Sequence, residues 1–123
     1  ILSAAQLAEL LDLTRHLGMD ALVEIHSPED YAVAHVVGCR LIGINNRNLA
    51  TFDTNLTTAT GLAALMAPNE TAVAASGIST RGDIKRTLRG GIFNFLIGES
   101  LVRSGDRVAF LKALIYDESQ NAT

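Results

Sequence analysis

Four short, mainly apolar runs, separated by segments of helical periodicity, constrain the fold of this chain more than any other feature. They cover residues 21–26, 41–44, 71–75 and 92–97. Such runs are typical of strands that are buried on both faces of a parallel sheet. Strands that alternate with helices through short connections form parallel sheets with right-handed crossovers. The pattern therefore predicts an α/β fold with a first helix and then four strand–helix units.

The chain length limits how many such units can be present. With 123 residues, the chain suffices for one domain, whereas a complete β/α barrel needs roughly 250 residues. We therefore expect half of a TIM (β/α)8 barrel, with four parallel strands and outer helices, over residues 1–116, and a frayed tail over residues 117–123. Because the first residue is Ile1 rather than Met, we also expect a piece of a longer chain.

Capping residues and glycines mark the expected helix ends. Ser3 and Gln6 have the spacing of a capping box, and Ser27 before Pro28 is typical of a helix start. A further cap is expected at Thr80, with an acidic residue three positions later. The predicted helices lie between residues 3 and 18, 27 and 38, 56 and 66, 80 and 90, 98 and 103, and 106 and 115.

Composition argues against several classes of partner. The net charge is −3 and no basic run exists, which argues against nucleic acid. No apolar run reaches the roughly 18 residues of a membrane span and no signal peptide is present, so we expect no membrane partner.

The only cysteine, Cys39, cannot form an intrachain disulfide and is expected to fill core space, in a reducing, cytoplasmic setting. No cluster of His, Cys, Asp and Glu has metal-ligand spacing, and we expect no cofactor.

A polar cluster directly follows the second apolar run. Residues 41–49 read LIGINNRNL, so the polar residues begin at the carboxyl end of a predicted strand, where barrels and open α/β sheets bind ligands. Asn45 and Asn46 offer neutral donors and acceptors, and Arg47 offers a charged fork that suits a phosphate. The alternative is an ordinary polar loop.

Two glycine-bearing turns follow the last two predicted strands, at residues 76–78 and 98–100. Barrels often hold phosphate in the loops after their last two strands and at the start of a short helix, where backbone amides face the anion. The pair of turns therefore predicts a phosphate site, with the Glu99 side chain pointing away and only its amide binding. Tight turns without a ligand are the alternative.

Residues 22–26, 41–52, 75–78 and 96–101 closely resemble the second half of indole-3-glycerol phosphate synthase. That family forms indole-3-glycerol phosphate from a carboxyphenylamino deoxyribulose phosphate, by ring closure, decarboxylation and dehydration, in tryptophan biosynthesis. The resemblance covers nearly the whole chain. It implies that Glu24 is a partly buried catalytic carboxylate, that Asn45 is an active-site residue and that Arg47 lies near the substrate phosphate. The implied phosphate cradle consists of Ser76, Gly77, Gly98 and Glu99.

The chain departs from the family pattern in two respects. Ala75 stands where the family has a glutamate that contacts substrate, and the half that carries the catalytic lysines is absent. Lys85 and Lys112 are expected on outer helices and cannot replace them. The chain alone should therefore be inactive or nearly so. Two other hypotheses stay open: a non-catalytic module that binds phosphate esters or assembles, and half of another phosphate-binding barrel, such as an isomerase.

Half a barrel is also expected to need a partner. Neighbouring residues along a strand point to opposite faces, so outer helices cannot cover every apolar strand residue among Leu22, Ile25, Ile42, Ile44, Val73, Phe93 and Phe95. We therefore expect a homodimer or larger assembly, or association with the missing N-terminal half. His16 and His35 are expected at the helix surface or at helix ends, and His26 follows Glu24 at a strand end, from which it could reach a ligand.

Overall fold

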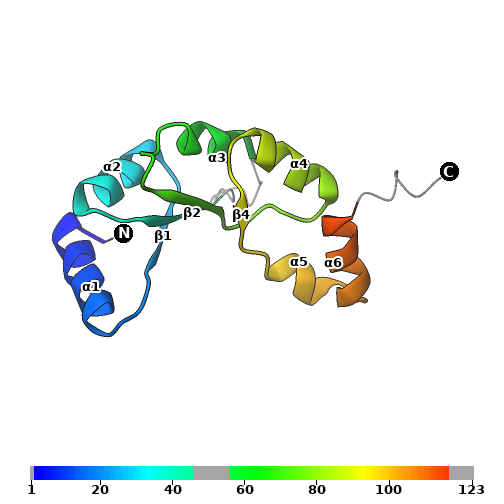
Figure 1. The fold of residues 1–123 in the computed structure, drawn as a ribbon, viewed down its shortest axis with the longest axis horizontal. Coiled ribbons are helices and arrows are strands. Elements are labelled where there is room, and N and C mark those ends of the chain that lie inside the picture. The colour runs from blue at the N-terminus through cyan, green and yellow to red at the C-terminus, as the bar shows by residue number, and fades with distance from the viewer. Residues whose placement is uncertain (1, 46–55, 117–123) are drawn as a thin grey trace.

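The computed structural model describes residues 2–45 and 56–116, so Arg47 and the expected tail at 117–123 lie outside it. Helices and strands alternate along the chain after the first helix (Figure 1). In chain order the elements are α1 Ala4–His16, β1 Leu22–Ile25, α2 Pro28–Val37, β2 Leu41–Ile44, α3 Leu56–Ala63, β3 Thr71–Ala74, α4 Arg81–Arg89, β4 Asn94–Phe95, α5 Glu99–Arg103 and α6 Arg107–Ile115.

The four strands form one parallel sheet in the order β1-β2-β3-β4. Its register pairs Leu22 with Leu41 and Leu41 with Thr71. Helices α2, α3 and α4 lie along one side of the curved sheet, with α1 at one end of the arch and α5 and α6 at the other (Figure 1). This arrangement is the expected half of a β/α barrel.

The helix starts agree with the capping pattern in the sequence. Ser3 and Thr80 each form a capping box, and the Ser27 hydroxyl accepts a hydrogen bond from the Asp30 amide. Capping side chains accept bonds from amides that have no partner inside the helix, which fixes where each helix begins. Helix α2 ends at Gly38, whose φ of 84° lies in the left-handed region that favours glycine.

Two elements are shorter in the structure than the sequence predicts. Helix α3 ends at Ala63 rather than at residue 66, because the next amides bond three residues back, from Leu65 to Leu62 and from Met66 to Ala63. Such bonds tighten the last turn into a 3₁₀ conformation. Strand β4 covers two residues rather than residues 92–97, although the Leu96 amide still donates to the Ala74 carbonyl over 2.9 Å.

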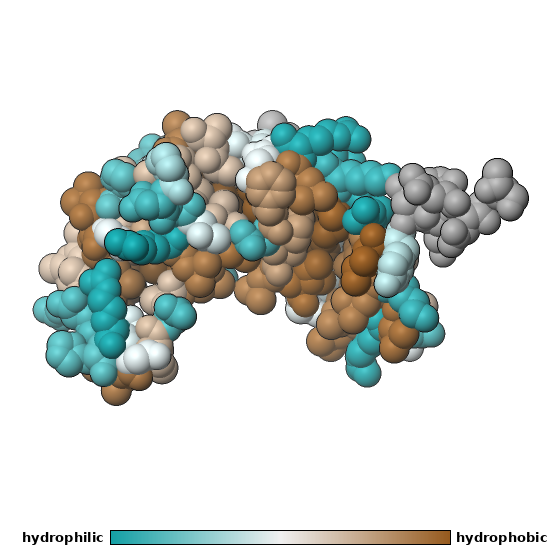
Figure 2. All heavy atoms as spheres, in the orientation of Figure 1, coloured by the Kyte–Doolittle hydropathy of each residue, from teal (hydrophilic) through white to brown (hydrophobic). Residues whose placement is uncertain are grey.

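The hydrophobic core lies between the sheet and its helices. On this helix-covered face Ile25, Ile42, Ile44 and Ala74 expose at most 1% of their surface, and Cys39 is buried in the same core as expected. The opposite, open face carries Leu22, Glu24, Gly43 and Val73. The register pairs Glu24 with Gly43 and Gly43 with Val73, and Leu22 lies two residues before Glu24 on the same side of β1. Figure 2 shows hydrophobic residues along the inner side of the arch.

As expected, the helices do not cover every apolar residue of the strand segments. Leu22 exposes 37% and Phe93 70% of its surface, whereas Val73 is buried and Phe95 is partly buried. The described residues include no helix with the length and apolar character that a membrane span requires.

Candidate functional site

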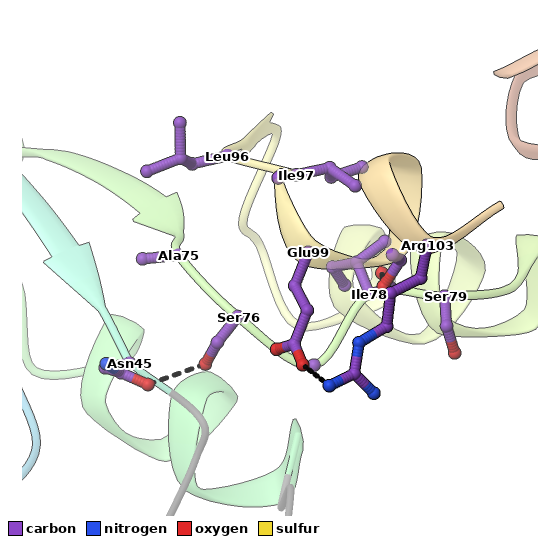
Figure 3. Close-up of a pocket in the computed structure, with 12 residues that line it drawn as sticks. Asn45, Ala75, Ser76, Ile78, Ser79, Leu96, Ile97, Glu99 and Arg103 are labelled. Atoms are coloured by element: carbon purple, nitrogen blue, oxygen red, sulfur yellow. Dashed lines mark hydrogen bonds and ion pairs between the residues drawn. The ribbon is translucent and has the colours of Figure 1, made fainter. Parts of the chain in front are cut away.

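A cleft opens at the carboxyl ends of the last three strands, between the turn after β3 and the turn before α5 (Figure 3). Its volume is about 440 Å³. Five residues singled out in the sequence meet in this cleft, although they come from three segments of the chain: Asn45, Ser76, Gly77, Gly98 and Glu99. Ala75, Ile78, Ser79, Leu96, Ile97, Ser100 and Arg103 complete the lining.

A side-chain hydrogen bond joins two of the predicted site residues. The Ser76 hydroxyl donates to Asn45 Oδ1 over 2.7 Å (Figure 3). The backbone on both sides is fixed, because the Asn45 amide donates to the Ile25 carbonyl and the Ala75 amide donates to the Ile44 carbonyl, each over 3.0 Å. The ladder thus continues one residue beyond the strands and holds both polar side chains at the cleft wall.

The two glycine turns are tied to each other. Gly77 has a φ of 79°, in the left-handed region, so the first turn requires a residue without Cβ. The Ser100 hydroxyl donates to the Ile78 carbonyl over 3.0 Å, which fixes α5 against that turn. A Cβ added at Gly98 would meet no described residue within 4 Å, so packing among the described residues does not require glycine there. The space in front of Gly98 is therefore available to a ligand.

Glu99 does not behave as predicted. Its side chain extends into the cleft and forms an ion pair with Arg103, with 3.0 Å between Glu99 Oε1 and Arg103 Nη2 (Figure 3). The guanidinium lies one helical turn further along α5 and draws the carboxylate into the cleft. Sequence reasoning missed Arg103 as a site residue. The signal was present, since Glu followed by Arg four residues later is a favourable helical pair.

Glu24 also departs from its prediction, because it is exposed rather than partly buried. It lies on the open face of the end strand β1 and borders a second groove of about 260 Å³, formed with α1 residues that include Leu7 and Leu10. The Glu24 side chain packs over Gly43, where an added Cβ would lie 3.3 Å from Glu24 Cγ. The residues that line the main cleft do not include Glu24.

Ala75 lines the cleft at the position where the family resemblance expects a glutamate. The cleft lining does not include His26, whose backbone amide donates to Asp30 Oδ2 over 2.9 Å. Lys85 and Lys112 lie on α4 and α6, as expected. In the part of the chain that the structure describes, no three His, Cys, Asp or Glu residues are placed to hold a metal ion.

A buried carboxylate at the opposite end of the sheet was not predicted. Glu70, just before β3, has only 4% of its side chain exposed. Its oxygens accept from the Tyr31 hydroxyl over 2.8 Å and the Ala67 amide over 2.8 Å, and lie 2.7 Å from His35 Nδ1. Burial opposes ionisation, but the hydrogen bonds with His35, Ala67 and Tyr31 outweigh it and lower the pKa of Glu70. Burial and the nearby carboxylate raise the pKa of Tyr31.

Comparison with known sequences identifies relatives over nearly the whole chain. The family model for indole-3-glycerol phosphate synthase matches residues 1–114. The indole-3-glycerol phosphate synthase of Desulfosudis oleivorans is 53% identical over 115 residues, which cover 94% of this chain and 44% of that protein. That of Syntrophobacter fumaroxidans is 48% identical over 113 residues, or 92% and 43%. The chain thus spans less than half the length of these relatives.

Two further comparisons extend this result. The multifunctional tryptophan biosynthesis protein of Phycomyces blakesleeanus is 37% identical over 115 residues, which cover 94% of this chain and 15% of that protein. Among solved structures, one described as native KDPGal matches 88% of this chain and 52% of its own, with a TM-score of 0.68 and 16% identity. At that identity the structural likeness supports the fold alone.

Proposed function

Because this chain belongs to the indole-3-glycerol phosphate synthase family, we propose that it supplies the phosphate-binding half of that lyase's barrel in tryptophan biosynthesis. Its small-molecule partner is then a sugar phosphate, whose phosphate binds between the Gly77 and Gly98 turns. The observation that carries this proposal is the convergence of five predicted site residues on one cleft. Neutral hydroxyls, an amide side chain and the first amides of α5 suit a phosphate ester there.

The phosphate site is tested by thermal unfolding of the purified chain in the presence of glycerol 3-phosphate. A ligand at 100 times its dissociation constant stabilises the folded state by about 2.7 kcal/mol, so the melting temperature should rise with concentration and saturate. Glycerol at the same concentrations, with sodium chloride added to match ionic strength, is the control. A melting curve that does not move at millimolar glycerol 3-phosphate argues against the site.

We further propose that Glu24 and Asn45 act in the chemical steps of the complete barrel, where Arg47 lies near the phosphate. Glu24 is exposed on the open face of the end strand β1. Once the other half is in place, this face forms the barrel interior and the edge of β1 is enclosed. A carboxylate in that position can transfer protons. This chain alone lacks the glutamate that the resemblance expects at Ala75 and the catalytic lysines, so it should not turn over substrate.

Turnover of the carboxyphenylamino substrate should therefore be undetectable with the purified chain, and Ala75→Glu alone should not restore it. Adding an N-terminal half of a relative is the decisive second assay, because activity that appears with it and disappears with Glu24→Gln supports the proposed role of Glu24. Product formation by this chain alone that is abolished by Glu24→Gln would contradict its proposed inactivity.

The open face supports a further part of the proposal, association with a second four-stranded unit. Among the described strands, β1 and β4 each pair on one side only, and Leu22 on the open face is exposed. A second copy in a two-fold pair, or the N-terminal half-barrel, would cover this face and satisfy the edges. Sedimentation equilibrium should then show a homodimer or larger assembly. A cooperatively folded 13.1 kDa monomer at micromolar concentration would contradict it.

A non-catalytic phosphate-binding module is the second candidate. Ala75 at the cleft and the exposed Glu24 favour it, and saturable binding of glycerol 3-phosphate with no activity in the complemented assay would select it. In either case we propose that the working unit is residues 1–116, that residues 117–123 form a tail, and that the lone buried thiol of Cys39 suits a reducing, cytoplasmic setting.

A further inference from the structure

The ion pair between Glu99 and Arg103 lies in the lining of the cleft where the phosphate is proposed to bind. Glu99 lies in the first turn of α5 and Arg103 at its end, four residues later, so both side chains share one face of the helix. Both line the cleft (Figure 3). The Glu99 carboxylate extends toward the turn that contains Ser76 and Gly77, where the phosphate is proposed to bind.

These two residues also carry the charges among the described residues of the cleft lining. Among its described lining residues only Glu99 and Arg103 are ionisable, and the others are neutral or apolar. A guanidinium presents the same planar fork to a carboxylate and to a phosphate. The Glu99 carboxylate therefore occupies a position that a phosphate oxygen can take on Arg103, and it repels an anion that enters the cleft.

The contact between the two side chains is exposed to solvent. The Arg103 side chain is 79% exposed and the Glu99 side chain 46% exposed. Exposed ion pairs contribute little to stability because water and salt screen the attraction. Of the contacts on Arg103, the one with Glu99 is exposed and screened, whereas a phosphate brings more charge and additional acceptors to the same guanidinium.

We propose that Arg103 is a phosphate-binding residue of this cleft and that Glu99 is its intramolecular competitor, which an incoming phosphate monoester displaces. This inference rests on the proposed phosphate site. Glu99 then lowers the affinity of the cleft for every anion and restricts it to ligands that carry enough negative charge to take over Arg103. A dianionic phosphate monoester meets that condition better than a carboxylate does.

The test measures glycerol 3-phosphate affinity of the full chain by titration calorimetry at constant ionic strength. Each substitution should change affinity about fivefold, the effect of one exposed charge contact. Glu99→Gln should tighten binding, and Arg103→Gln should weaken it. In the Glu99→Gln background, Arg103→Gln should cost more than in the original chain, because the guanidinium no longer has a competitor. Arg103→Lys should retain part of the affinity, since lysine keeps the charge but loses the fork.

Matched controls separate a direct contact with the phosphate from the general effect of net charge on affinity. Glu9→Gln on α1 and Arg89→Gln on α4 change net charge by the same amounts at exposed positions outside the cleft lining. Affinity should change less than twofold in both. Circular dichroism melts should show that all variants fold, and the Arg103 Nε–H signal in nitrogen-15 spectra should shift when glycerol 3-phosphate is added to the original chain.

The outcomes distinguish this inference from the proposed function. If the original chain binds glycerol 3-phosphate but Glu99→Gln leaves the affinity unchanged or weakens it, the competitor role is wrong while the site stands. If Arg103→Gln leaves the affinity for glycerol 3-phosphate unchanged and the Arg103 Nε–H signal of the original chain does not shift, Arg103 does not bind the phosphate. If neither the original chain nor any variant binds glycerol 3-phosphate, both the site and this inference fail.

Discussion

On the helix-covered face of the sheet Ile42 and Ile44 have no exposed surface, whereas on the open face Leu22 keeps 37% of its surface exposed and Glu24 is exposed as well. The same four strands supply both faces, so composition alone does not explain the contrast. Each strand–helix unit brings the helix that covers its own outer side, but the inner side of a barrel is filled by residues from strands on every side. The outer core is therefore complete in half a barrel, and the inner one is not.

The largest effect on the free energy of unfolding should come from truncating a buried side chain on the helix-covered face. Ile42→Ala removes a side chain with 0% exposure from the core and should lower the free energy of unfolding by about 3 kcal/mol, through lost burial and a cavity. Urea denaturation followed by circular dichroism measures this value. A loss below about 1 kcal/mol would show that this face is less well packed than its exposure indicates.

A second prediction concerns the buried carboxylate of Glu70, just before β3. Glu70→Gln should lower the free energy of unfolding at pH 7 by about 2 kcal/mol, because it disturbs buried hydrogen bonds to a charged group. The folded-state pKa of Glu70 is lowered from 4.5. Its contribution is therefore fully present above the unfolded pKa and is lost as pH falls through the folded pKa.

Urea denaturation between pH 7 and pH 3 checks this dependence. The original chain should lose stability below about pH 4.5 more steeply than Glu70→Gln does, because the variant lacks the titrating group. Glu9→Gln, at an exposed position on α1, is the matched control and should follow the original chain. Parallel pH curves for the original chain and Glu70→Gln would contradict the assignment.

A smaller effect is expected at the cleft. Gly77→Ala places a Cβ at a φ of 79°, which costs about 1–2 kcal/mol for a residue with an L side chain. Stability should fall by that amount and glycerol 3-phosphate should no longer raise the melting temperature. Gly98→Ala is the informative comparison, because its added Cβ meets none of the described residues within 4 Å. It should leave stability nearly unchanged and weaken only the ligand effect.

The smallest effect should come from the open face. Leu22→Ala should lower the free energy of unfolding by about 0.5 kcal/mol or less in a monomer, since exposed positions gain little from burial. If the chain associates through this face, the loss should grow with protein concentration. Unfolding curves of the original chain and the variant at 1 and 100 µM measure it. A loss as large as that of Ile42→Ala at both concentrations would remove the contrast between the two faces.

The sequence was sufficient to predict features that depend on short separations along the chain. The caps at Ser3, Ser27 and Thr80 were predicted because each side chain bonds an amide three residues away. The four parallel strands followed from apolar runs separated by helical segments. Asn45 and the two glycine turns were each predicted at the carboxyl end of a strand, and the carboxyl ends of parallel strands meet at one edge of a sheet.

The remaining features depend on contacts that no local pattern encodes. Tyr31 and Glu70 are 39 residues apart, and nothing near either residue indicates that they meet. The exposure of Glu24 follows from the incomplete face beside it rather than from its own apolar strand. The orientation of Glu99 depends on Arg103, whose spacing was readable but whose position in the cleft requires the packing of α5 against the turn after β3.

The strand order has a consequence for how the chain acquires its structure. Each strand pairs with the one made just before it, and no described strand pairs with one further away in the sequence. The sheet can therefore grow in one direction during synthesis, with every new strand adding to an edge that already exists. Contacts of short sequence separation favour fast folding, and N-terminal parts can fold while later parts are still being made. The growing edge would be finished last, at β4, beside the cleft.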